Sequence, residues 1–447
     1  MPAPDVAALL TALERSDPDA AEAARVAVEW LTGGEALETV AQLDVCEFLW
    51  YTLPVKISGG EAEHARIARA LGRLLRLGGM ERYAAFCASP TTVQILRTYA
   101  RAGEDAGMAA YQRALEATGV LPPDVPELSW SSIMGPEELG AHVACSAALE
   151  LAIVAGELEL GAPAWKQRRE ELTRRWVTTA RTELGGDSWL QRVHGERLNR
   201  WVLGRGAARR DLAQPFEVRL HAPVPPPSEP HLDALRWLLE LGVTGVPLTQ
   251  RNNIARALVT EAAERFGWDR WAPRAPRTES QIPTLVTLHT IAQGELRALR
   301  RTGRTLVITT RGRRLLADPG LLWDAAAATL ITPAQGEYEF ELSAREVALM
   351  LLAEGRPVDR DDLRVKVVEI LGDDGWQHRP SHPAPGVDDL NVARALAEFR
   401  RRLDALGLRV IPDRWNGPDQ LTSVGRSAAL AALRTQALRP RQYVNLG

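Results

Sequence analysis

The chain has 447 residues, of which 45% are hydrophobic and 25% charged, and a formal net charge of -3. A chain of this length can form about two to four domains with separate cores, and its balance of apolar and charged residues excludes a disordered protein. It has no apolar run long enough to cross a membrane, and its N-terminus lacks the basic start and apolar core of a secretory signal. We therefore expect a cytoplasmic protein that does not contact a membrane.

The basic residues are almost all arginines, because the sequence has only three lysines, Lys56, Lys166 and Lys366. Together with the high alanine content, this bias indicates a GC-rich genome rather than selection for phosphate binding. A single arginine is therefore weak evidence for a binding site.

Net charge varies along the chain: it is -10 over residues 1–150, +8 over residues 151–325 and -1 over residues 326–447. A protein that is neutral overall can bind nucleic acid if its cations lie on one face. We expect such a face in the middle segment. The acidic residues 1–150 should repel phosphate. We therefore expect this segment to contact a protein partner, or to face away from nucleic acid.

Residues 1–213 are predicted to form an all-helical domain. Apolar residues recur at spacings of three and four in residues 61–79, 89–103 and 135–158, which is the pattern of amphipathic helices. A further helix over residues 165–181 mixes arginines with glutamates, which favours a solvated face with local ion pairs.

The three cysteines, Cys46, Cys87 and Cys145, are far apart, and each lies on an apolar helical face. We expect buried, reduced thiols rather than a disulfide or a metal site. Residues 214–230 contain three consecutive prolines and two flanking ones, which favours an extended polyproline segment. This linker is the predicted main boundary.

After the linker, residues 231–325 and 326–447 repeat one order of elements: three helices, a β-hairpin and a closing helix. In the first segment the second helix is expected to begin after a cap at Thr249, and the closing helix after a cap at Thr309 or Thr310. Thr302-Gly303 is the predicted hairpin turn, because glycine supplies the positive φ that tight hairpins need. Pairing across it places three apolar residues on one face, Leu299, Leu306 and Ile308.

In the second segment, Ser343 and Glu346 have the spacing of a capping box, which predicts a helix start. Asn416-Gly417 marks the turn of its hairpin. Both segments share the motif T-x-x-G-R, at residues 309–313 and 422–426.

This order of elements, with the shared motif, resembles the winged helix-turn-helix domain, present twice between about residues 230 and 435. The whole chain also resembles large actinobacterial proteins of unassigned role. The expected fold is mainly α: an N-terminal multi-helix domain over residues 1–213, then winged-helix modules over residues 231–325 and 326–447. The resemblance implies that each third helix enters the major groove of DNA while the hairpin, or wing, lies along phosphates or in the minor groove.

Carried over by position, the candidate nucleic-acid-binding residues are arginines of both modules. Those of the first module belong to the wing and the helix after it, and those of the second to its third helix: Arg297, Arg300, Arg301, Arg304, Arg311, Arg313, Arg314, Arg394, Arg400 and Arg401. The third helix of the first module contains no lysine or arginine. It offers only Gln281, His289 and Gln293 for base contacts, so we expect little sequence-specific reading there.

Two functions fit this interpretation. The first is a DNA-binding regulator whose helical domain senses a signal or recruits a protein partner. The alternative is a non-catalytic adaptor whose winged helices contact protein. The sequence carries no signal for an oligomeric state.

Catalytic signatures are missing from the sequence. No glycine precedes a lysine as in a phosphate-binding loop, and H-E-x-x-H, C-x-x-C and G-x-S-x-G do not occur. His378 and His382 lie among aspartates in residues 373–389, a cluster that could bind a divalent metal, but its prolines favour an exposed linker. We expect neither an enzyme nor a bound cofactor.

Overall fold

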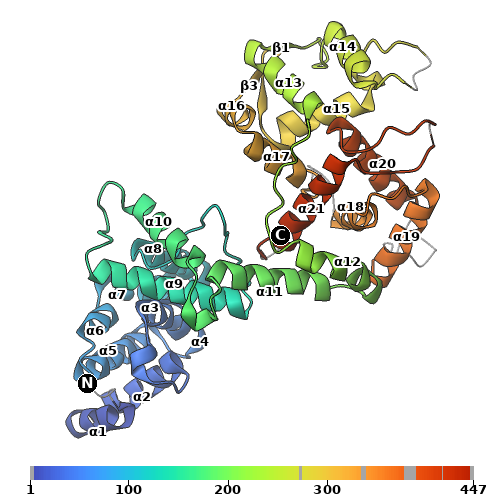
Figure 1. The fold of residues 1–447 in the computed structure, drawn as a ribbon. Coiled ribbons are helices and arrows are strands. Elements are labelled where there is room, and N and C mark those ends of the chain that lie inside the picture. The colour runs from blue at the N-terminus through green and yellow to red at the C-terminus, as the bar shows by residue number, and fades with distance from the viewer. Residues whose placement is uncertain (1–4, 271–273, 334–338, 377–388, 415, 443–447) are drawn as a thin grey trace. The chain divides into compact units, whose positions relative to one another are not determined.

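The computed structural model describes residues 5–270, 274–333, 339–376, 389–414 and 416–442 (Figure 1). These residues form a mainly α-helical fold with one three-stranded antiparallel sheet. The chain divides into two compact units: the first covers residues 1–193 and 440–447, and the second covers residues 194–439. The division falls within helix α11, Trp189–Leu203.

The first unit is helical throughout its regular structure. Three helices predicted from periodicity are present as α5, α7 and α9, and Ser89 caps α7 by accepting a hydrogen bond from the Thr92 backbone N–H. The cysteines are buried and free, as predicted. The helices are α1 Val6–Ser16, α2 Pro18–Thr32, α3 Gln42–Glu47, α4 Leu53–Lys56, α5 Glu61–Leu77, α6 Glu81–Cys87, α7 Pro90–Ala102, α8 Glu104–Ala117, α9 Pro136–Val154 and α10 Trp165–Thr178.

Helix α10 confirms the prediction of a solvated, ion-paired face. Arg168 lies 2.8 Å from Glu157, and Arg175 lies 3.1 Å from the same carboxylate. Arg169 pairs with Glu116 at 2.7 Å. The four arginines of this helix, at residues 168, 169, 174 and 175, thus each pair with an acid of the same unit.

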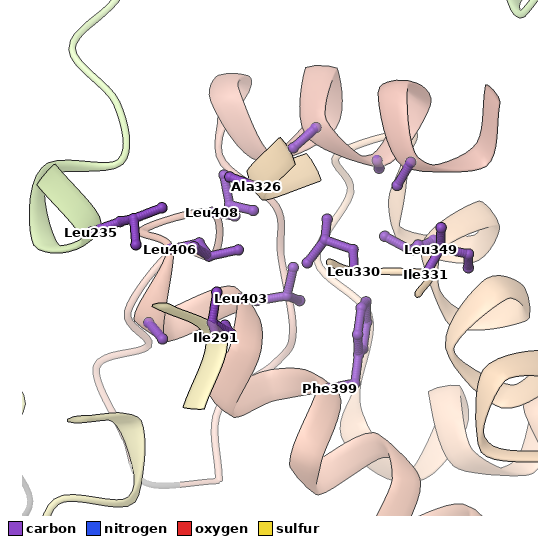
Figure 2. Packing of buried hydrophobic residues seen from close by; sticks show 14 of the residues in the cluster. Leu235, Ile291, Ala326, Leu330, Ile331, Leu349, Phe399, Leu403, Leu406 and Leu408 are labelled. Atoms are coloured by element: carbon purple, nitrogen blue, oxygen red, sulfur yellow. The ribbon is translucent and has the colours of Figure 1, made fainter. Parts of the chain in front are cut away.

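The second unit contains both predicted modules around one continuous core. In Figure 2, Ile291 from the first module lies with Phe399 and Leu403 from the second, and all three are buried. Its elements are α12 Ala207–Arg219, α13 Asp233–Thr244, β1 Val246–Pro247, α14 Arg256–Phe266, α15 Pro283–Thr290, β2 Leu299–Thr302, β3 Thr305–Ile308, α16 Thr310–Ala317, α17 Pro319–Ala328, α18 Glu339–Leu352, α19 Arg360–Asp373, α20 Asp389–Ala405 and α21 Ser423–Ala437.

Helix α12 packs against α18 and α19, so residues before the predicted linker belong with the modules. The first part of the linker, residues 214–219, continues this helix, with Pro215 inside it. The extended chain that the prolines predict begins only after Leu220.

The three strands have the order β1-β3-β2. Leu299 pairs with Ile308 and Thr302 with Thr305, so the two-residue turn is Gly303-Arg304, one position later than predicted. Gly303 has φ 60°, which is the conformation that favours glycine. The predicted apolar face is present, because Leu299, Leu306 and Ile308 are all buried.

The second module forms a smaller version of this arrangement from isolated β-bridges. Val358 pairs with Asp419, and Arg409 pairs with Leu421. The segment at 419–421 therefore lies between the other two, as β3 lies between β1 and β2 in the first module.

The shared T-x-x-G-R motif has the same geometry in both modules. Thr309 accepts a hydrogen bond from Gly312 N–H at 3.0 Å, while its own N–H donates to Ala298 O at 2.9 Å. Thr422 makes the matching bonds with Gly425 N–H at 2.9 Å and Leu408 O at 3.0 Å. The threonine therefore caps the closing helix and fastens it to the start of the hairpin.

Two predicted helix starts are wrong. Helix α14 begins at Arg256, because Thr249 instead closes a turn in which its N–H donates to Asn253 O at 2.8 Å. Helix α18 includes Glu339–Leu352, which places Ser343 and Glu346 inside the helix. Both side chains are buried, so they are not the capping box that their spacing predicts.

Candidate nucleic-acid interface

Seven arginines lie on the first hairpin and on the first turns of the helix that follows it. We call this set the wing surface: Arg297, Arg300, Arg301, Arg304, Arg311, Arg313 and Arg314. All seven are exposed, and none of their side chains forms a hydrogen bond or an ion pair within the part of the chain that the structure describes. The apolar face of the hairpin is buried against the core of the module. The arginines of β2 and of the turn therefore point into solvent.

Helix α16 carries three of these arginines at its N-terminal end and has no acidic residue in its first turn. The helix dipole places partial positive charge there, so each nearby cation is unfavourable by about 0.3–1 kcal/mol at low salt. An anion bound beside Arg311, Arg313 and Arg314 would relieve this repulsion.

Arg297 lies two residues before the start of β2 and has φ 50°, a left-handed conformation that is uncommon for arginine. Its carbonyl accepts a hydrogen bond from Thr309 Oγ1 at 2.9 Å. The strained residue is thus held where the chain turns into the hairpin.

The third helix of the first module, α15, offers little for reading bases. His289 is engaged on both ring nitrogens, with Glu279 at 2.7 Å and with Gln293 at 3.0 Å. The side chain of Gln281 accepts hydrogen bonds from the Arg277 and Thr278 backbone N–H groups. Helix α15 also packs against α20, the third helix of the second module.

The three candidate arginines of the second module lie in different environments. Arg394 is exposed and has no ion-pair partner in the described ranges. Arg401 pairs with Glu398 on its own helix at 3.0 Å. Arg400 donates from Nε to Asp419 at 2.6 Å and is largely buried, so its role is structural in this geometry.

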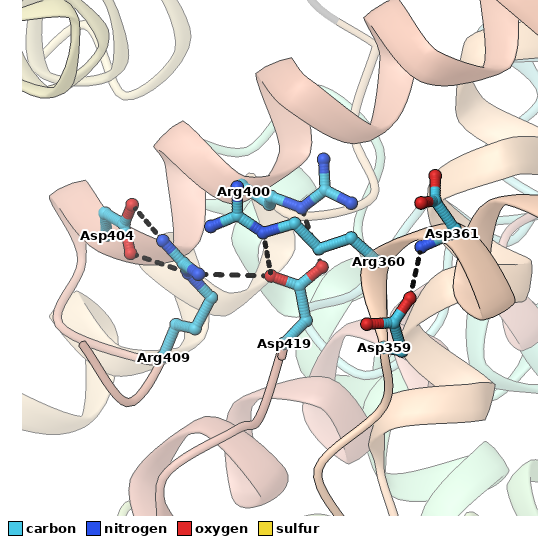
Figure 3. Close-up of polar contacts among 7 residues, drawn as sticks. All are labelled: Asp359, Arg360, Asp361, Arg400, Asp404, Arg409 and Asp419. Atoms are coloured by element: carbon cyan, nitrogen blue, oxygen red, sulfur yellow. Dashed lines mark hydrogen bonds and ion pairs between the residues drawn. The ribbon is translucent and has the colours of Figure 1, made fainter. Parts of the chain in front are cut away.

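Asp419 is the centre of a buried ion-pair cluster that the sequence did not reveal (Figure 3). Besides Arg400, it faces Arg409 at 3.1 Å and Arg360 at 4.0 Å. Asp404 also pairs with Arg409, at 2.7 Å. Burial lowers the pKa of Arg360, and the positive charges of Arg400 and Arg409 lower it further. The negative charge of Asp419 has the opposite effect on this pKa. The cluster ties the second hairpin to α19 and α20.

A second buried network surrounds Arg209, of which 1% is exposed. Its guanidinium pairs with Glu346 and, at 2.8 Å, with Asp374. Trp201 Nε1–H donates to the same Glu346 carboxylate. Burial lowers the pKa of Arg209, but Glu346 and Asp374 raise it by more, so the group stays charged. Glu346 therefore anchors α12 to α18.

Sequence reasoning found the wing surface because a hairpin is a local feature. It missed Asp419 and Glu346, whose partners lie on other elements. The cluster of His378 and His382 lies outside the described residues. Within the ranges that are described, no group of three metal-ligating side chains occurs, and no helix has both the length and the apolar character of a membrane span.

Comparison with known protein families matches part of the second unit. Residues 232–321 match the model of a family described as the Y4jL N-terminal domain. The matched range runs from the start of α13 into α17, so it contains the sheet and the whole wing surface. No curated protein and no solved structure matches the chain.

Proposed function

We propose that the protein binds nucleic acid through the wing surface, by contacts to the phosphate backbone. The observation that carries this proposal is the state of the seven arginines: they are exposed on one hairpin and the adjoining helix turns, and no described carboxylate neutralises them. The arginines of α10, by contrast, have acidic partners. Guanidinium groups without partners are the donors that phosphate oxygens require.

The expected binding is tolerant of sequence. Phosphate contacts position a protein on a duplex, whereas base contacts specify the site. Helix α15 has no lysine or arginine, and the side chains of His289 and of the preceding Gln281 are held by local hydrogen bonds. We expect about four to six arginines each to displace one counterion from the nucleic acid. A plot of the logarithm of the association constant against the logarithm of the salt concentration should then have a slope of about -4 to -5.

The test is a fluorescence-anisotropy titration of the full chain against a duplex, at two salt concentrations. The variant replaces Arg300, Arg301 and Arg304 with alanine; the control replaces Arg168, Arg174 and Arg175, which removes equal charge from paired arginines of α10. We expect the first to weaken binding and to make the salt slope shallower by about 2 to 3, since each phosphate contact contributes about 0.9. The control should bind as the unaltered protein does.

Two results count against the proposal. One is that the unaltered protein does not bind the duplex at low salt. The other is that both triple variants lose equal affinity, which would show that binding depends on net charge and not on the wing surface.

A second candidate, a protein-interaction adaptor, is favoured by helix α9. This helix exposes a row of large apolar side chains at helical spacing: Leu139 is 52% exposed, Val143 39%, Leu151 68% and Val154 62%. Exposed apolar patches of this kind mark protein contacts. A photo-crosslinking amino acid at Leu151 should then capture a protein in cells, whereas one at Val218, which is 82% exposed, should not.

A further inference from the structure

The segment that follows helix α21 returns to the first unit. Residues 440–447 belong to that unit, although α21 and Arg439 belong to the second. The chain therefore passes between the units twice, once within α11 after Val193 and once after Arg439. We call the described residues of the returning segment the strap: Pro440, Arg441 and Gln442.

The loop before α9 binds the backbone of Arg441 on both sides. The Arg441 N–H donates to Ser131 Oγ at 2.9 Å. The Arg441 carbonyl accepts hydrogen bonds from the backbone N–H groups of Ser132, at 2.7 Å, and of Ile133, at 3.4 Å. The loop thus recognises the donor and the acceptor of one peptide segment together.

Ser131 is oriented for this contact by a buried carboxylate. Glu138 of α9 is fully buried and accepts from both the N–H and the Oγ–H of Ser131, at 2.6 Å and 2.9 Å. Because the hydroxyl proton points to Glu138, the oxygen lone pairs are left to accept from Arg441. The loop is therefore shaped for the strap by groups of the first unit alone.

Gln442 adds side-chain contacts to the same loop. Its amide oxygen accepts a hydrogen bond from Ser132 Oγ, and its Nε2 donates to Trp130 O at 3.5 Å. The Trp130 ring packs edge-on against His142 of α9, with ring centroids 5.1 Å apart. The loop that holds the strap is thus anchored to α9 through both Glu138 and His142.

The two crossings of the chain lie side by side. Arg197 follows the first crossing on α11, and its Nη1 donates to the carbonyl of Leu438, just before the second crossing, at 2.7 Å. The Arg197 side chain is buried. Domains joined by one segment can rotate about several axes, whereas a second neighbouring connection leaves fewer ways to bend.

We propose that the strap is a detachable second connection between the units, and that it limits their relative motion while it is docked. Ser132, Arg441 and Gln442 are exposed, so water can replace their hydrogen bonds. Release of the strap should therefore require much less free energy than unfolding of either unit. This device does not depend on the wing surface or on nucleic-acid binding.

The first test compares two shortened chains with the full chain by hydrogen–deuterium exchange. One ends at Arg439 and lacks the strap; the matched control ends at Gln442 and keeps every described contact of the strap. Without the strap, the amides of Ser132 and Ile133 lose their acceptor and should exchange at least about tenfold faster. The control should exchange as the full chain does.

The second test measures the motion in the same three chains by double electron–electron resonance. Spin labels are attached to Leu77→Cys in the first unit and Val365→Cys in the second, at positions that are 52% and 56% exposed. The native cysteines are buried, which favours labelling at the introduced sites. The distribution of label distances should be wider in the chain that ends at Arg439 and unchanged in the control.

Three results would overturn the proposal. The first is equal exchange of the two amides with and without the strap, and the second is an equal width of the distance distribution. The third is a loss of helical circular dichroism in the chain that ends at Arg439, because the segment would then belong to a core and would not be a strap.

Discussion

Asp419 shows how one residue can hold a module together. It is buried between Arg360, Arg400 and Arg409, and among the residues that the structure describes only Arg409 pairs with a second carboxylate, Asp404. Replacing Asp419 with alanine leaves buried guanidinium groups without a counter-charge, which costs about 3–5 kcal/mol. We expect a loss of this size in the free energy of unfolding, measured in urea.

The matched control is Asp413→Ala, on the same hairpin segment, where the side chain is exposed. It should change stability by less than about 0.5 kcal/mol, since exposed substitutions away from specific contacts have small effects. Equal losses in the two variants would show that the buried cluster adds nothing to stability.

His142 should make the first unit sensitive to acid. Burial lowers its pKa to about 4, while the neighbouring Glu138 acts in the opposite direction. The unfolded chain binds this proton near pH 6.5, so between about pH 6.5 and pH 4 the unfolded state is protonated first and stability falls as the pH falls. The contribution is complete above pH 6.5 and is about 3 kcal/mol smaller at pH 4.

His142→Gln cannot take up the proton, so its unfolding free energy should change less between pH 7 and pH 4 than that of the unaltered protein. Urea unfolding of both proteins at the two pH values measures this difference. A parallel decline in the two proteins would mean that other groups cause the acid sensitivity.

At the scale of elements, the glycine of the repeated motif is the most constrained position. A Cβ at Gly312 would lie 2.2 Å from Ala298 O, and one at Gly425 would lie 1.9 Å from Leu408 O. Neither backbone carbonyl can move without breaking its hydrogen bond to the capping threonine. Either alanine substitution should therefore lower stability by at least about 2 kcal/mol, despite the better helix propensity of alanine.

Gly294→Ala serves as the control for thermal unfolding, because a Cβ there meets no atom within 4 Å. It should leave the midpoint unchanged or raise it. If Gly312→Ala and Gly294→Ala behave alike, the close approach of helix and strand does not set the requirement for glycine.

The elements also show what the sequence can predict. The hairpin and its apolar face follow from local alternation, and Thr309 follows from local capping chemistry. Ser343 and Glu346 have the spacing of a capping box, yet Glu346 is the buried partner of Arg209, more than a hundred residues away. Spacing alone cannot distinguish the two roles, because the deciding partner lies on another element.

The candidate site divides in the same way. Exposure of Arg300 and Arg301 was predictable, since it depends on the strand pairing within one hairpin. The burial of Arg400 was not predictable, because it depends on the ion pair with Asp419, which lies beside α20. The contact between α15 and α20 could not be predicted either, since these helices come from different modules.

For the whole molecule, the position of α12 has a consequence for how the chain can be divided. The prolines of residues 214–230 suggest a cut there, but Arg209 and Trp201 lie before that point and pair with Glu346 inside the modules. A fragment that begins at residue 221 would remove the cation that pairs with Glu346 and Asp374 and would open both carboxylates to solvent. It would also expose the core surface that Phe216 and Ala213 cover.

We therefore expect a fragment of residues 194–439 to unfold cooperatively in urea and a fragment of residues 221–439 to show a lower midpoint or no cooperative transition. Equal midpoints for the two fragments would contradict this view, because α12 would then be an attachment to the modules and not a component of their shared core.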